Sequence, residues 1–323
     1  MTTLWDTTGT AVVKALAAER RTGGGVTSGL ALTLVVVMEE KDAAEVEAAI
    51  SIAASKHPMR VLMVLRHTIE APVPRLDAEV SIGGRYGPGE SVILRMYGRL
   101  ALHAESVTLP LLAPDAPVVA WWYSETPNTI AHDPLGVFAD RRITNVIRDA
   151  DPAASLHRRA LDYAPGDTDL TWTVITPWRA ALASAFDTVR VRAQSVTVNG
   201  NPLDPSAQLL AGWLSDRLGI YVPVAKAEGK YISSVSAQFE GGHSVDLVNE
   251  GYKLVLRRPG QADSIAPFPS RSTGDLLAEE LRRLDPDESY AEALGAVTGQ
   301  KNLNDRPANR VHIWHDPALA VEG

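Results

Sequence analysis

The sequence LALTLVVVMEEKDAAEVEAAISIAASKHPMRVLMVLR, residues 30–66, contains a complete β-α-β unit. Its two nearly continuous apolar runs, Leu30–Met38 and Arg60–Arg66, are typical of strands that are covered on both faces. The residues between them that recur at helical spacing are Val46, Ala49, Ile50 and Ala53. A helix that connects two buried strands predicts a parallel pair, as in a Rossmann-like sheet.

The connection after the first strand argues against a dinucleotide site. Such a site needs glycines at this turn, so that backbone N–H groups can approach a pyrophosphate. Here the turn is Glu39-Glu40-Lys41-Asp42, which has no glycine and whose carboxylates would repel phosphate. Asp42 and Glu45 instead have the spacing of a capping box for the helix that follows. We therefore expect no bound cofactor.

Further elements extend this unit. The residues of 76–82 alternate between apolar and polar, which predicts a half-exposed strand. Val118–Trp122 predicts a short buried strand. Asp169–Phe186 carries apolar residues every four positions, as in a long amphipathic helix, and Pro177 should kink it or split it in two.

A second unit is expected from residue 189 onward. Val189–Val198 resembles a strand, Asp204-Pro205 should begin a helix, and Gly219 should end it. Several strand-like runs and two helices follow, the last beginning at a capping turn with Asp285 and Glu288. The fold class is thus α/β with two α/β units, the first built on a mostly parallel Rossmann-like sheet and the second on a mixed sheet with flanking helices. The expected boundaries are 1–188 and 189–298, followed by a polar, mobile tail at 299–323.

Composition excludes several classes of function. The formal net charge is −8 and the isoelectric point is about 5.5, which disfavours contact with phosphate backbones, so we expect no nucleic acid partner. The longest apolar run is far shorter than the ~20 residues of a membrane-spanning helix, and the first ten residues lack the features of a signal peptide. We expect a cytoplasmic protein without a membrane partner. There are no cysteines, so the chain has no disulfide, thiolate metal site or thiol switch of its own.

No motif supplies an evident catalytic centre. The eight histidines are scattered, and His312 and His315 would need a further ligand to hold a metal. Asp167 and Asp169 could act as a carboxylate pair, but their position at the start of a helix favours a capping role. We therefore expect no catalytic residues and no metal site.

Two segments are unusually rich in tryptophan. They are PDAPVVAWW at 114–122 and GDTDLTWTVITPWR at 166–179. Trp121 and Trp122 alternate along a strand, so one ring should face the core, and the other is an interface anchor if its face is uncovered or a core residue if a helix covers it. The candidate partner-binding residues are Trp121, Trp122, Trp172, Trp178 and Arg179.

Arg141 and Arg142 are the candidate anion-binding residues. Adjacent arginines can bind a phosphate or the carboxylates of a partner. They can equally pair with nearby acids such as Asp133, Asp140 or Asp169. Both interpretations stay open on the sequence alone, with local pairing favoured.

Most of the chain resembles the OpcA family of glucose-6-phosphate dehydrogenase assembly proteins. The most specific of the motifs that carry this resemblance is a GDTD sequence followed by a tryptophan and then by WR. Tyr123 and Asn145 depart from the proline and aspartate that the family has after AWW and RRIT. The matching stretches are HPMRVLMV (57–64), RLDAEV (75–80), LLAPDAPVVAWW (111–122), DPLG (133–136), RRIT (141–144), GDTDLTW (166–172), PWRA (177–180), AGWL (211–214) and LAEELRRLDPDESY (277–290).

The resemblance implies a non-catalytic partner of glucose-6-phosphate dehydrogenase that promotes the active oligomer of that enzyme and raises its activity. Two alternatives remain. One is a sugar-phosphate- or nucleotide-binding enzyme or sensor with an α/β cleft, in which Arg141 and Arg142 would hold the phosphate. The other is a homo-oligomeric scaffold without a ligand.

Overall fold

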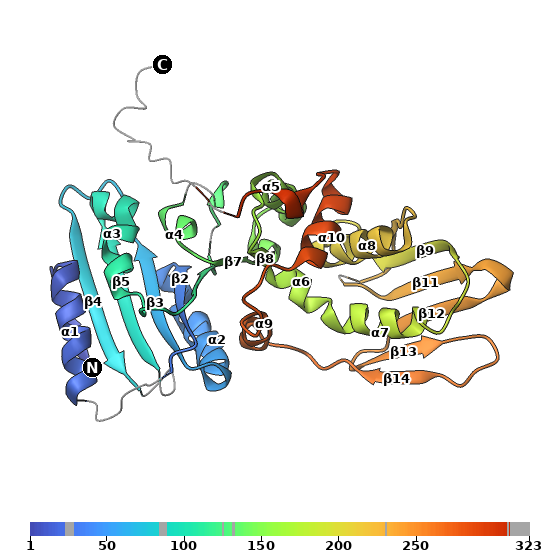
Figure 1. Cartoon of the computed structure of the whole chain (residues 1–323), viewed down its shortest axis with the longest axis horizontal. Helices are drawn as coiled ribbons and strands as arrows, with labels where there is room; N and C mark the ends of the chain where they lie inside the picture. Colours follow the sequence, from blue (N-terminus) through green and yellow to red (C-terminus); the bar gives the residue numbers. More distant parts are fainter. Residues whose placement is uncertain are drawn as a thin grey trace, which may run out of the picture. The chain divides into compact units, whose positions relative to one another are not determined.

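The structure is a computed structural model that describes residues 1–22, 29–83, 89–124, 126–130, 133–229, 231–308 and 310. The chain divides into two compact units (Figure 1). The first contains Met1–Thr144 and Thr273–Pro286, and the second contains Asn145–Ser272 and Asp287–Arg306. This division differs from the expected boundary at residue 188, because side chains of 145–186 form part of the second hydrophobic core.

The first unit has a mostly parallel sheet, as predicted. Its strands follow the order β1-β4-β5-β3-β2-β6-β7, in which the pairs from β5 to β7 are parallel, while β4 is antiparallel to both of its neighbours. The strands are β1 (Thr2–Leu4), β2 (Leu32–Met38), β3 (Met59–Arg66), β4 (Arg75–Ile82), β5 (Glu90–Tyr97), β6 (Val118–Trp122) and β7 (Arg141–Thr144).

Helices pack against this sheet. The buried faces of α1 and α3 join a core with alternate residues of β4 and β5, which explains the apolar–polar alternation of β4. The helical elements are α1 (Gly9–Thr22), η1 (Glu40–Asp42), α2 (Ala43–Lys56), η3 (Gly98–His103), α3 (Ala104–Thr108), η4 (Leu109–Leu111), α4 (Pro134–Val137) and α9 (Thr273–Glu280).

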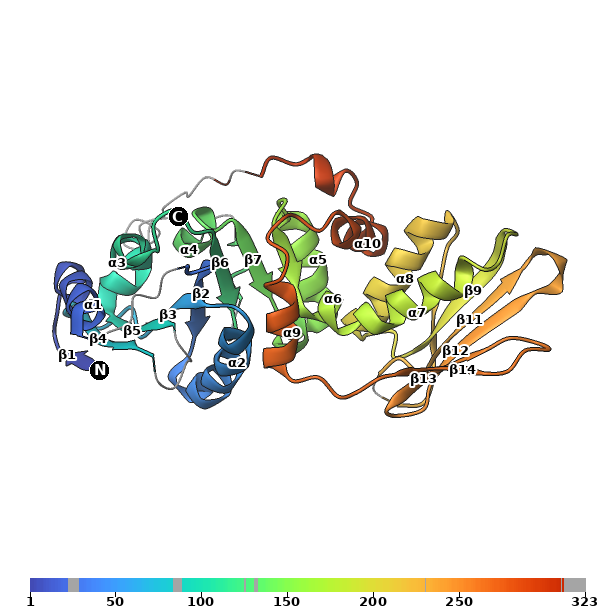
Figure 2. The same cartoon turned by 60° about the horizontal axis from the view of Figure 1, so that its bottom comes forward.

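Helix α9 returns to the first unit from late in the sequence and lies beside α2 (Figures 1 and 2). Gly274 permits this close approach, because a Cβ atom there would lie 2.8 Å from Cβ of Ile52 and 2.9 Å from the carbonyl oxygen of Ala49. A hydrogen bond of 2.8 Å between His57 Nε2 and the carbonyl oxygen of Ala278 joins the same two helices. The first unit is therefore completed by residues more than two hundred positions away.

The capping box expected at Asp42 and Glu45 is absent. Asp42 occupies the N-cap position of α2, but its side chain makes no capping hydrogen bond. Its carboxylate accepts a hydrogen bond from Ser124 Oγ at 2.5 Å, and Glu45 accepts one from the hydroxyl of Tyr123. Long-range partners at the end of β6 thus take the place of the local cap.

The second unit contains a mixed sheet with helices packed on one face. The strand order is β10-β9-β11-β12-β13-β14, in which β10 is parallel to β9 and the other pairs are antiparallel. The elements are η6 (Val146–Arg148), α5 (Pro152–Asp162), β8 (Asp167–Asp169), α6 (Leu170–Val174), α7 (Thr176–Phe186), β9 (Ala193–Gly200), α8 (Pro205–Leu218), β10 (Val224–Lys226), β11 (Ser234–Phe239), η7 (Glu240–Gly242), β12 (Ser244–Asn249), β13 (Lys253–Arg257), β14 (Ser264–Pro267), α10 (Glu288–Thr298) and η8 (Leu303–Asp305).

Several local signals have the predicted effect in this unit. Pro177 lies in the first turn of α7 and the helical stretch is split at Ile175. Asp204 caps α8 by accepting a hydrogen bond of 3.0 Å from the backbone N–H of Ser206, and Gly219 ends that helix with a φ of 67°. Helix α10 begins two residues later than expected, because its cap is Asp287 and not Asp285.

The segment after α10 is anchored, at least as far as Arg306. Leu303 is buried in the second core. The guanidinium group of Arg306 donates hydrogen bonds to the carbonyl oxygens of Ala160, Leu161 and Tyr163 at 2.9, 3.1 and 3.2 Å, where α5 ends. The expected mobile tail therefore does not begin at residue 299, and residue 309 and residues 311–323, which include His312 and His315, lie outside the described part of the chain.

Gly212 offers a test of the contact between α8 and α10. A Cβ atom at this position would lie 2.4 Å from the carbonyl oxygen of Ala293 and 2.5 Å from a methyl carbon of Val297. We expect Gly212→Ala to lower the free energy of unfolding in urea by about 1–3 kcal/mol, although alanine favours a helix by about 1 kcal/mol. Gly9→Ala in α1 is the control, since the added methyl group would meet ordinary contacts at 3.7 Å. Equal or higher stability of Gly212→Ala would contradict this packing.

Candidate functional site

The tryptophans of β6 both lie in the interior. Trp121 is 0% exposed and Trp122 is 1% exposed. The Trp122 ring belongs to the core formed with β4 and β5. Gly136 lies close to this ring, since a Cβ atom at that position would be 3.4 Å from Cη2 of Trp122. Trp121 makes an edge contact with the ring of Tyr123 at 5.3 Å between centroids. The sequence left open whether the second ring is an interface anchor or a core residue, and the structure shows that both rings are core residues.

The tryptophans of α6 and α7 are also buried, at 1% exposure for Trp172 and 2% for Trp178. The indole N–H of Trp172 donates a hydrogen bond of 2.8 Å to Asp287 Oδ2, at the cap of α10. Trp178 packs edge-on against Phe268. We therefore correct the expectation of an exposed indole-rich surface: the four rings are buried and pack inside the fold, because segments distant in sequence cover them.

Arg179 is the one member of this set that keeps partial exposure. Its guanidinium carbon lies 3.6 Å above the centre of the Trp172 ring, in a cation–π arrangement. It also donates a hydrogen bond of 3.1 Å to Thr176 Oγ1. A role for Arg179 in partner binding stays a prediction.

Arg141 and Arg142 are engaged inside the first unit, and each is 2% exposed. Arg141 forms an ion pair with Glu280 and donates hydrogen bonds to the carbonyl oxygens of Arg283 and Asp285 at 2.6 and 3.0 Å. Arg142 donates to the carbonyl oxygen of Ala139. We correct the anion-site expectation, because these side chains hold the chain together at positions that solvent barely reaches. The acid that pairs with Arg141 is remote in sequence, so local spacing did not reveal it.

Of the two carboxylates of the GDTD sequence, Asp169 caps α6 and Asp167 closes the turn that precedes β8. Asp169 accepts hydrogen bonds from the backbone N–H groups of Thr171 at 2.8 Å and Val146 at 2.9 Å. Asp167 accepts one of 2.9 Å from the backbone N–H of Ala164. Asp169 is 0% exposed, so it does not face a space in which a substrate could bind. The structure thus supports capping over acid catalysis for Asp169 and gives Asp167 a turn-forming role.

Ligands of parallel α/β sheets usually bind beyond the carboxyl ends of the strands. In the first unit, side chains of the protein itself meet at this edge. Ser124 and Tyr123 bind Asp42 and Glu45, as described above, and Arg66 forms a double hydrogen bond with Asp133 at 2.7 and 3.0 Å. The turn that would hold a pyrophosphate is acidic and already paired. These residues do not fit a nucleotide cofactor.

A buried ionic cluster lies at the opposite, amino-terminal edge of the same sheet. Glu90 accepts hydrogen bonds from Arg60 at 2.6 Å and from Arg20 at 2.7 and 2.8 Å. Burial alone would raise the pKa of the Glu90 carboxyl, but the hydrogen bond from Arg20 and the charge of Arg60 outweigh it and lower this pKa. Its position at the edge that ligands avoid, together with this pairing, indicates a structural role.

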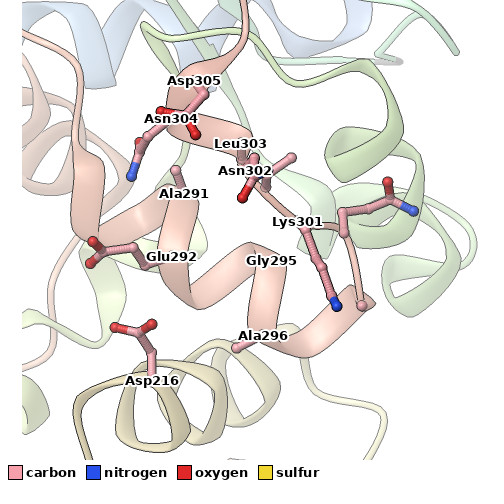
Figure 3. A pocket seen from close by; sticks show the side chains of 12 residues that line it. Asp216, Ala291, Glu292, Gly295, Ala296, Lys301, Asn302, Leu303, Asn304 and Asp305 are labelled. Atoms are coloured by element: carbon pink, nitrogen blue, oxygen red, sulfur yellow. The ribbon is translucent and has the colours of Figure 1, made fainter. Parts of the chain in front are cut away.

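A surface pocket of about 610 Å³ lies beside α10 (Figure 3). The side chains of Asp216 and Glu292 lie next to each other there, while Lys301 lies apart from them along the pocket. Glu292 forms an ion pair of 2.7 Å with Arg217. The ionisable side chains that line it are those of Asp216, Glu292, Lys301 and Asp305, and two of them, Asp216 and Glu292, form ion pairs with Arg217.

Large exposed rings occur outside the two tryptophan-rich segments, at positions that the sequence did not single out. Trp5 is 68% exposed, Tyr221 is 84% exposed and Tyr252 is 81% exposed. The available signal for Trp5 was its setting, since it lies between Leu4 and the polar sequence DTT, outside any apolar periodicity. An isolated ring of this kind has no neighbours in sequence to cover it.

Within the described ranges, no three or more His, Asp or Glu side chains come together in a way that could hold a metal ion. None of the described helices has both the length and the apolar character that crossing a bilayer requires.

These observations define a two-unit α/β protein whose candidate reactive groups are engaged in its own packing. Comparison with family models shows the family to which the chain belongs. Residues 49–161 match the N-terminal domain of the glucose-6-phosphate dehydrogenase subunit family, and residues 165–294 match the C-terminal domain of the same family. The chain belongs to the OpcA family of glucose-6-phosphate dehydrogenase subunits, as the sequence resemblance indicated.

Other comparisons add little. No curated protein matches the chain. Similar solved structures include a probable oxidoreductase, yhhX, with 9% identity, a TM-score of 0.41 and coverage of 86% of this chain and 98% of that chain. An NAD binding oxidoreductase from Klebsiella pneumoniae has 10% identity, a TM-score of 0.43 and coverage of 85% and 96%. With TM-scores this low, these similarities say nothing about activity.

The Glu90 cluster gives a prediction on pH. Because its pKa is lowered in the folded state, Glu90 contributes stability that is fully present above its ordinary pKa of 4.5 and is lost as the pH falls through the folded value. Glu90→Gln should lower the free energy of unfolding at pH 7 by about 3–5 kcal/mol, because Arg60 stays buried without its counter-charge. The difference between the two proteins should shrink below pH 4.5.

Urea titrations from pH 3 to pH 7 would measure this difference. Glu250→Gln is the matched control, since Glu250 pairs with Lys253 and Arg257 at the surface and its loss should change stability little. A difference for Glu90→Gln that stays constant across the range would show that the cluster does not act through ionisation.

Proposed function

We propose that this protein is a non-catalytic subunit that binds glucose-6-phosphate dehydrogenase, promotes the active oligomer of the enzyme and raises its activity. The observation that carries the proposal is the match of both halves of the chain to the glucose-6-phosphate dehydrogenase subunit family. The protein would then act at the entry to the oxidative pentose phosphate pathway. The expectation that it does so in the cytoplasm stays a prediction.

The state of the candidate reactive groups supports a non-catalytic role. Asp169 and Arg141 are buried and bound to other parts of the chain. The carboxyl edge of the first sheet is occupied by pairs such as Ser124 with Asp42. An enzyme needs groups that are free to meet a substrate, and these groups are committed to folding.

The engagement of Arg141 and Arg142 weakens the alternative of a sugar-phosphate or nucleotide enzyme. That alternative assigned the phosphate to these two side chains, which donate instead to Glu280 and to backbone carbonyls. A different anion site would be needed to sustain it. We therefore put forward the subunit role alone.

The mechanism follows from linkage. A partner shifts an equilibrium between two enzyme states only by its differential affinity for them. A preference of about 1–3 kcal/mol for the active oligomer would raise its population by roughly 5–150-fold. Because this chain has no cysteine, any thiol-dependent control of the complex must reside in the dehydrogenase.

An activity assay tests this role. Purified glucose-6-phosphate dehydrogenase should show a higher rate or a lower half-saturation for glucose 6-phosphate when this protein is added, with a matching shift in assembly state by light scattering. The protein alone, given the same substrate and coenzyme, should produce no turnover. Unchanged rate, half-saturation and assembly, or turnover by the isolated chain, would each refute the proposal.

A further inference from the structure

Trp5 is exposed and follows β1, the strand at the edge of the first sheet. It directly follows β1, whose register pairs Leu4 with Ala78 of β4. The next residue, Asp6, donates its backbone N–H to Asp77 Oδ1 at 2.9 Å. These two constraints hold the backbone on both sides of Trp5, so the indole is presented from a fixed position next to Asp77. Of the tryptophans that the structure describes, it has the most exposed side chain.

The sheet face next to Trp5 is ordered by aromatic and ionic contacts. Asp77 forms an ion pair with Arg75, and the Arg75 guanidinium carbon lies 5.1 Å from the centre of the Tyr97 ring. Tyr97 stacks on His67 with 4.4 Å between centroids and an angle of 5° between the planes. Since Asp77 and Arg75 lie two residues apart on β4, they share one face, opposite the face of Leu76 that packs in the core with α1.

We propose that this surface, formed by Trp5, Arg75, Asp77, Tyr97 and His67 and called here the Trp5 patch, is where glucose-6-phosphate dehydrogenase docks. The proposal rests on the proposed function. It adds to that function a contact surface and the chemistry of the partner surface that fits it.

The composition of the Trp5 patch is that of an interface centre. Tryptophan, tyrosine and arginine are the residues whose truncation most often costs a complex its affinity. Here the arginine is already held by Asp77 and Tyr97. Little side-chain freedom remains to be lost on binding, which favours affinity.

The surrounding charge favours a different protein over a second copy of this chain. The half-exposed carboxylate of Glu40 lies at the border of the patch, where it pairs with Arg95 and lies 3.7 Å from His67. Asp6 adds another exposed acid beside Trp5. Each copy of the chain carries a formal net charge of −8, so the approach of two copies is electrostatically unfavourable. The complementary surface is basic, with an apolar recess for the indole.

Replacement of the exposed ring tests the contact. Trp5→Ala should weaken binding of the purified dehydrogenase, measured by interferometry, by about 30-fold or more, as expected for a central interface tryptophan. Tyr252→Ala is the matched control, because this ring is also largely exposed but lies in the second unit. Thermal unfolding should be unchanged in both variants, since neither ring contributes to a core.

Salt provides a second measurement. If a basic surface meets the exposed acid beside Trp5, the association rate of the wild-type protein should fall as ionic strength rises, and Asp6→Asn should lower the rate at low salt. An association rate that rises with salt would contradict the assigned partner chemistry.

The outcomes separate this proposal from the broader one. Undiminished binding by Trp5→Ala, while the wild-type protein still binds and activates the dehydrogenase, would overturn the patch and leave the proposed function standing. A wild-type protein that does not bind the enzyme at all would overturn both. Self-association of the isolated chain that Trp5→Ala abolishes would assign the patch to a second copy and refute the proposal.

Discussion

The hydrogen bond from the Trp172 indole to Asp287 joins two segments of the second unit that lie far apart in sequence. Asp287 Oδ2 accepts this bond at 2.8 Å, while its other oxygen accepts the backbone N–H of Tyr290 at 3.0 Å and caps α10. Arg179 lies over the face of the same indole. A buried indole without an acceptor is costly, so the position of α10 is tied to that of α6. The specific GDTD-x-x-W sequence is thus a structural requirement of this core.

Burial of charge follows the same rule in the first unit. Arg60 and Glu90 are each 3% exposed and satisfy each other, with Arg20 as a third member. Arg141 meets Glu280 on the returning helix α9. Charged groups are stable in an interior only when they are paired. A side chain in such a pair is not available to bind a ligand. The fold keeps the layout of a nucleotide-binding unit, but the edge where a nucleotide would bind is filled from within.

The proposed docking role would use the outer surface of the protein. The family of the chain names glucose-6-phosphate dehydrogenase as the enzyme concerned. Its surface offers a few large exposed rings, of which Trp5 is held between two backbone constraints and bordered by ordered charges. Recognition through a rigid ring and a charged border needs no chemistry from the subunit itself. This agrees with the commitment of its buried polar groups to packing.

The sequence by itself determined the local elements and the family. The β-α-β unit, the split at Pro177, the cap at Asp204 and the mixed second sheet follow from periodicity and from residues within a few positions of one another. It did not determine which rings are covered. The partners of Trp172, Arg141 and Asp42 lie 115, 139 and 82 residues away, and no pattern of spacing reveals contacts at such separations. Only the tertiary structure could place the expected surface indoles in the core and leave Trp5 outside, because burial depends on which distant segments pack together.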